Sequence, residues 1–72
     1  MVQLEFHYSF TMFSGGPKLD LSKIPECKIK SYSVENDRVH LIVLCEDREI
    51  AEKLKHYYLI RYEIFPKTEK II

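Results

Sequence analysis

Much of what identifies a protein class at the sequence level is missing from this chain. Its 72 residues include no tryptophan, two cysteines, and eleven basic against eleven acidic side chains. Two cysteines are too few for a disulfide-stabilised scaffold, and no apolar run approaches the roughly 20 residues that span a bilayer. The net charge of zero removes the usual electrostatic basis for tight binding to nucleic acid or to an anionic membrane. We therefore expect no membrane partner, and a nucleic-acid partner needs support from other features.

Two further absences bear on localisation and source. The first ten residues, MVQLEFHYSF, lack the charged region, apolar segment and small-residue cleavage site of a signal peptide, so we expect a cytoplasmic protein. Glutamine and asparagine occur once each, whereas lysine, glutamate and isoleucine are plentiful. That balance leans towards a thermophilic source.

What the chain does contain is a set of short strand patterns. Apolar residues occupy every even position from Val2 to Met12, and this period of two indicates a strand with one buried face. Glycine and proline at 14–17 end the pattern. The other segments that we expect to form strands are 27–33, 38–45 and 59–65.

One helix is expected, over residues 47–57. Ile50, Ala51 and Leu54 fall on one face by the three-and-four spacing of an amphipathic helix, together with Tyr57 and Tyr58. Acidic residues at the start and basic residues at the end suit the helix dipole. We interpret the charged face as a solvated surface.

These elements predict an α+β fold, a small and mainly antiparallel four-stranded sheet with one helix on one face. A ferredoxin-like fold has the same order of elements with a helix in the first crossover, where residues 18–26 predict only a connection with one helical turn around Leu19 to Lys23. The alternative is a three-strand meander followed by a helix and a fourth strand. We expect a single domain over residues 1–66 and a C-terminal tail over 67–72.

The two cysteines raise the question of catalysis, and the register of the central hairpin bears on it. If residues 35–37 form a three-residue loop, Cys27 faces Cys45 on the side that the helix covers. A register slipped by one residue would bury Lys28 and Lys30 unpaired, at a cost of several kcal/mol. We therefore expect a buried, inert pair of thiols. The same register also sets Val34 against Arg38, Ser33 against Val39, Ser31 against Leu41 and Ile29 against Val43.

The surroundings of Cys45 also disfavour a catalytic thiol. A nucleophilic cysteine needs a positive environment that lowers its pKa, whereas Glu46 and Asp47 follow Cys45 directly. His40 alternates to the other side of the same strand. A cross-strand disulfide with Cys27 remains the alternative, and a zinc site lacks further ligands on that side.

The histidines give no recognisable site either. His7, His40 and Glu5 are metal-ligating residue types, but their spacing matches no metal motif. We expect solvated or interface histidines, no metal and no cofactor. With no paired carboxylates or nucleophile motif, we expect a protein that is not an enzyme.

The expected strand 38–45 is apolar on both faces, because Ile42 and Leu44 lie opposite its core residues. One helix cannot cover both faces of a sheet, so the second face predicts an interaction surface. We expect a homodimer, formed by packing sheet on sheet or by exchanging tails. The expected interface residues are Ile42, Leu44, Leu59, Phe65, Ile71 and Ile72.

Two functions follow from this pattern. The first is a non-enzymatic, self-associating interaction or assembly module. The alternative is a single-stranded RNA or DNA binder that uses the open sheet face, where aromatic and basic groups would stack on bases and neutralise phosphates. The candidate binding residues on that face are His7, Lys28, Lys30, Tyr32, Arg38 and His40.

Overall fold

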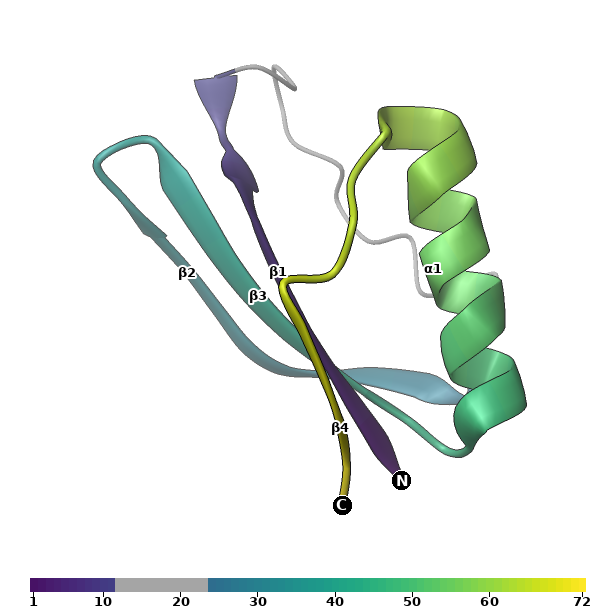
Figure 1. Cartoon of the computed structure of the whole chain (residues 1–72). Coiled ribbons are helices and arrows are strands. Elements are labelled where there is room, and N and C mark those ends of the chain that lie inside the picture. The colour runs from purple at the N-terminus through teal and green to yellow at the C-terminus, as the bar shows by residue number, and fades with distance from the viewer. Residues whose placement is uncertain (12–23) are drawn as a thin grey trace.

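The computed structural model describes residues 1–11 and 24–72, which form a four-stranded antiparallel sheet with one helix (Figure 1). The strands are β1 (Val2–Ser9), β2 (Cys27–Glu35), β3 (Arg38–Cys45) and β4 (Thr68–Ile71), and the helix is α1 (Arg48–Tyr62). The strand order is β2-β3-β1-β4, with antiparallel pairing between every two neighbours. The predicted α+β class is thereby confirmed.

The strand order distinguishes between the two predicted topologies. A meander would pair β1 with β2, but β1 lies between β3 and β4, so the meander is wrong. The ferredoxin-like alternative stays a prediction, because its first crossover would run through residues 12–23. Those residues, with the helical turn predicted around Leu19 to Lys23, lie outside the described part of the chain.

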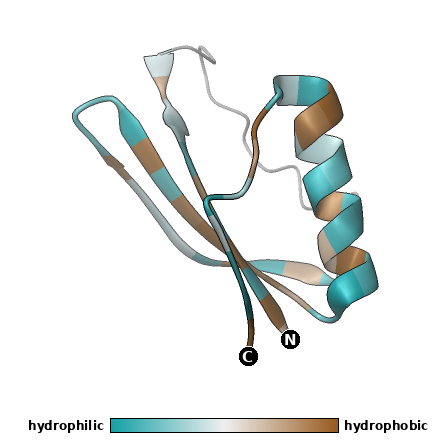
Figure 2. Cartoon of the chain, viewed as in Figure 1, coloured by the Kyte–Doolittle hydropathy of each residue, from teal (hydrophilic) through white to brown (hydrophobic). Residues whose placement is uncertain are grey.

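The core lies between α1 and one face of the sheet. Every even residue of β1 from Val2 to Tyr8 and every odd residue of β3 from Val39 to Cys45 is buried. Polar and apolar residues alternate along β1 and along the first half of β3 (Figure 2), as is typical of a sheet with one covered face. The strand period seen in the sequence is therefore the period of burial.

Helix α1 is longer than its sequence pattern predicted. It begins after the N-cap Asp47, whose side chain accepts a hydrogen bond from the Ile50 amide at 2.9 Å, and ends at Glu63 in the left-handed region at φ 55°. Ala51, Leu54 and Tyr58 are its buried residues. The described residues contain no helix that is both long and apolar enough to cross a membrane.

The fourth strand lies further along the chain than predicted. Residues 59–65, expected to be a strand, contain the end of α1 and the connection after it. The strand is Thr68–Ile71, inside the segment 67–72 that was expected to be a C-terminal tail. It pairs with residues 2–5 of β1, and Lys55 of α1 forms an ion pair with Glu69 at 2.6 Å. Residues 67–72 are therefore part of the sheet.

The predicted register of the β2–β3 hairpin is right near Cys27 and wrong near the turn. The turn has two residues, Asn36 and Asp37, with φ of 50° and 66°, as a type I′ turn requires. The predicted pairs Cys27–Cys45 and Ile29–Val43 are confirmed, but the predicted partners of Ser31, Ser33 and Val34 are wrong. The observed pairs there are Ser31 with Ile42, Tyr32 with Leu41, Ser33 with His40, Val34 with Val39 and Glu35 with Arg38.

The physical reason is a bulge between Ile29 and Ser31, where Lys30 is the extra residue in β2. An extra residue in one strand reverses which face each later side chain occupies. Tyr32 and Val34 therefore share the helix side with Ile29, and the serines face the opposite side.

Candidate functional site

The sheet face opposite α1, here called the open face, carries five of the six predicted binding residues. His7 pairs with His40 and Ser9 with Arg38 across β1 and β3, while Lys28 pairs with Leu44. Lys30 reaches the same face, because its Nζ lies 3.1 Å from Gln3 Oε1. The exception is Tyr32, whose partner Leu41 is a core residue, so its predicted place on the open face is wrong.

A carboxylate and two imidazoles meet near the middle of the open face. Glu5 Oε2 lies 2.5 Å from His7 Nε2, and the rings of His7 and His40 have centroids 4.1 Å apart. The hydrogen bond from His7 holds the pKa of Glu5 below its ordinary value. Within the described ranges, no group of three or more His, Cys, Asp or Glu side chains is placed to hold a metal ion.

Ile42 and Leu44 lie in the centre of the open face but are half-buried there. Polar residues of the neighbouring strands flank both side chains. Lys30 of β2 and Gln3 of β1 form their hydrogen bond across the intervening strand β3. The long polar side chains thus shield part of this apolar surface within the single chain.

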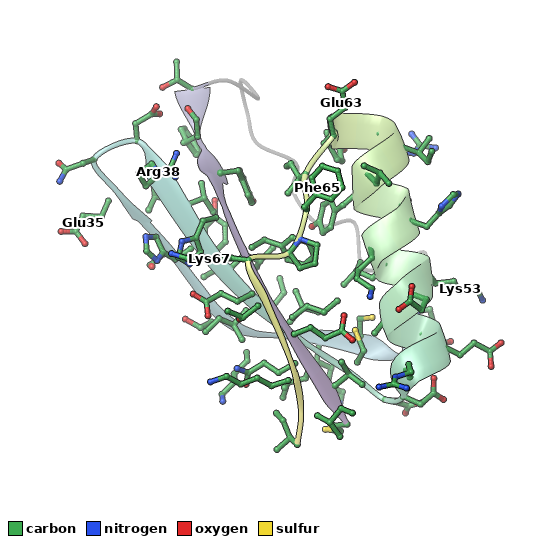
Figure 3. All side chains as sticks on the ribbon, viewed as in Figure 1. Glu35, Arg38, Lys53, Glu63, Phe65 and Lys67 are labelled. Atoms are coloured by element: carbon green, nitrogen blue, oxygen red, sulfur yellow. The ribbon has the colours of Figure 1, made fainter. Side chains whose placement is uncertain are left out.

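The remaining predicted interface residues do not join Ile42 and Leu44. Leu59 belongs to α1 and lines a shallow groove with Phe65, which follows the helix (Figure 3). Ile71 pairs with the core residue Val2, on the helix side of β4, and Ile72 follows it. The six residues therefore form no single patch, because two of them, Leu59 and Phe65, were predicted from a strand that is in fact helix and connection.

A different apolar surface lies on the helix side of β2. Ile29, Tyr32 and Val34 are 48%, 52% and 44% exposed, although their side chains point to the same side of the sheet as the core. Helix α1 packs on β1 and β3, and the hairpin tip extends away from it (Figure 1). We call these three residues the β2 apolar row.

The β2 apolar row borders an open strand edge. Among the strands that the structure describes, β2 is the last on its side of the sheet and has nine residues, whereas β4 at the opposite end has four. Lys28 and Glu35, near the two ends of β2, are exposed and form no ion pair or side-chain hydrogen bond with another described residue. Edge strands present unpaired main-chain groups that a second chain can use.

The two thiols lie where the sequence predicted them. Cys27 and Cys45 are both buried and free, with their sulfur atoms 3.2 Å apart. Burial raises the pKa of each thiol above its ordinary value, and nearby carboxylates raise it further. A thiol held in its neutral form is a poor nucleophile.

The β2 apolar row is the feature that sequence reasoning missed. The dipeptide Asn36-Asp37 was the available signal, because a two-residue turn needs residues that tolerate a positive φ. A two-residue turn fixes the faces of Tyr32 and Val34, and a bulge must then follow if Cys27 is to face Cys45.

Comparisons of the chain with protein-family models, with curated proteins and with solved structures found no match in any of the three. The function is therefore inferred from the surfaces themselves.

Proposed function

We propose that this chain is a small, non-enzymatic interaction module that self-associates, with a homodimer as its working form. The observation that carries the proposal is the β2 apolar row, three large apolar side chains that are about half exposed beside an open strand edge. A domain of this size buries a smaller fraction of its surface than a larger domain does, so added apolar contact stabilises it.

The candidate chemical groups support a role without catalysis. Burial raises the pKa of Cys27 and Cys45, and the Nε2 atom of His7 is engaged by Glu5. The closeness of two free thiols fits a reducing compartment such as the cytoplasm. The strand order, which places β1 between β3 and β4, supports a ferredoxin-like topology as part of the same proposal.

A single-stranded nucleic-acid partner is the second candidate, and the charge of the open face favours it. The strands place Lys28, Lys30, Arg38 and Lys70 on that face, against the two acidic residues Glu5 and Glu35. Against it, Tyr32 lies on the other face, so the stacking aromatic predicted there is missing. Binding to single-stranded RNA that weakens steeply with salt would favour this candidate.

Sedimentation and light scattering over a wide range of protein concentration test the main proposal. We expect a reversible dimer, with a mass that rises from one chain towards two as the concentration increases. A mass of one chain at every concentration would contradict self-association.

A further inference from the structure

We propose that two copies of this chain dimerise by pairing their β2 edges in antiparallel fashion, with Tyr32 facing Tyr32 across the two-fold axis. This inference rests on the proposed function and names the surface and the partner, a second copy. The result would be one continuous eight-stranded sheet with both helices on the same side.

The residues that this pairing needs direct their main-chain N–H and C=O groups to the open edge of β2. The Glu46 amide donates to the Glu26 carbonyl at 3.2 Å, so residue 26 turns its main-chain groups inward to the neighbouring strand. Because these directions alternate along an antiparallel strand, the main-chain groups of Ile29 point outward.

Beyond the bulge, the two-residue turn determines which residues point their main-chain groups inward to β3 and which point them outward. The residues that flank such a turn bond to each other, so Glu35 points inward and both Val34 and Tyr32 point outward. The three residues of the β2 apolar row therefore direct their main-chain N–H and C=O groups to the open edge. Their side chains stay on the helix side, where the apolar rows of two copies would meet.

The side chains of β2 are complementary to a second copy in this register. Tyr32 lies on the axis, and Lys30 and Ser31 count as one position because of the bulge. Ile29 then faces the partner's Val34 on the helix side. On the open face Lys28 faces the partner's Glu35, and symmetry makes two such ion pairs. Glu35 extends outward from the hairpin in Figure 3 and forms no ion pair with a described residue. Apolar and opposite-charge pairs both stabilise neighbouring strands.

The neighbouring registers that keep the faces matched are poorer. A shift one way puts the bulge on the axis and sets Lys30 against the partner's Lys30, two like charges at close range. A shift the other way leaves Ile29 without a partner strand and shortens the ladder. The favoured register also closes the assembly, because each copy uses its β2 edge once and, of the described strands, only the four-residue β4 remains at an outer edge.

Charge reversal tests the register. We expect Lys28→Glu and Glu35→Lys each to raise the dimer dissociation constant about tenfold, because each change turns two attractive pairs into repulsive ones. The double variant Lys28→Glu/Glu35→Lys restores attraction and should return to within about threefold of the wild type. Lys30→Glu is the matched control, with the same charge change on the same strand, and should shift the constant by less than about threefold.

Amide hydrogen exchange gives a second measurement that does not depend on charge. The amides of Ile29, Tyr32 and Val34 should exchange more slowly as the wild-type protein is concentrated, since they become hydrogen-bonded in the dimer. Circular dichroism of each variant confirms that it folds. A wild-type dimer that the double reversal does not rescue, or whose three amides stay unprotected, overturns edge pairing but leaves self-association standing. A wild type that is monomeric throughout overturns both.

Discussion

Replacing Tyr58 by phenylalanine should stabilise the protein. Tyr58 is 1% exposed at the centre of α1, and its ring packs edge-on against Phe6 with centroids 4.7 Å apart. Its hydroxyl is buried and has no hydrogen-bond partner among the described residues. Burial raises the pKa of Tyr58 well above the ordinary value, as expected for a phenol that no polar group solvates.

The expected gain follows from the cost of leaving that hydroxyl unpaired. A buried polar group without a partner costs about 1–3 kcal/mol, while Tyr58→Phe keeps the ring and its packing. We therefore expect the free energy of unfolding in urea to rise by about 1 kcal/mol, and the melting temperature to rise by roughly 4–8 °C. Tyr57→Phe is the control, since Tyr57 is only half-buried, and should change stability by less than about 0.5 kcal/mol. A loss of more than about 1 kcal/mol for Tyr58→Phe would refute the reasoning, because it would show that the hydroxyl is bonded.

Three further predictions concern the core, the hairpin turn and pH. Leu54→Ala should lower the free energy of unfolding by about 2–5 kcal/mol, because Leu54 is buried. Lys53→Ala is the control and should change it by less than roughly 0.5 kcal/mol, because the Lys53 side chain points away from the sheet (Figure 3). Equal effects of the two changes would mean that the helix faces the other way. Asp37→Ala should lower the free energy of unfolding in the same urea titration, because its carboxylate accepts hydrogen bonds from Ser9 Oγ and the Thr11 amide at 2.7 Å. Burial raises the pKa of Cys27 and Cys45, so their contribution is complete below the unfolded thiol pKa of about 8.5 and is lost as pH rises above it. A free energy of unfolding that stays flat from neutral pH to about pH 10 would contradict this last expectation.

The sequence was sufficient for the elements whose burial follows one strict period. In β1 and β3 every second residue is apolar and buried, so both strands and their buried faces were predicted. The Cys27–Cys45 pairing also followed, because the alternative register would have buried two lysines at a cost of several kcal/mol. A register can be predicted from the sequence when its alternative would bury unpaired charged groups at a large cost in free energy.

The end of the helix was missed because local propensity and tertiary packing conflict there. LIRY at 59–62 is rich in residues with strand propensity, yet these residues continue α1. Tyr58 buries its ring against Phe6, and Tyr62 packs beside Tyr58 with ring centroids 5.9 Å apart. Tertiary packing thus outweighs a propensity difference of about 1 kcal/mol or less. The displaced strand then forms from the next segment, 68–71, which was expected to be a tail.

The bulge at Lys30 connects the error in the hairpin to the choice between the two functions. Without the extra residue, Tyr32 would lie on the open face beside His40 and the basic side chains, as an aromatic platform for a nucleic-acid base. With it, Tyr32 and Val34 join Ile29 on the helix side, and the open face keeps its lysines but gains two serines. Bases need aromatic surfaces for stacking, whereas a second β2 strand needs an apolar row in phase with outward main-chain groups. One inserted residue therefore moves Tyr32 and Val34 from the open face, where they would suit a nucleic-acid base, to the helix side, where they suit a second copy of the chain paired along the β2 edge.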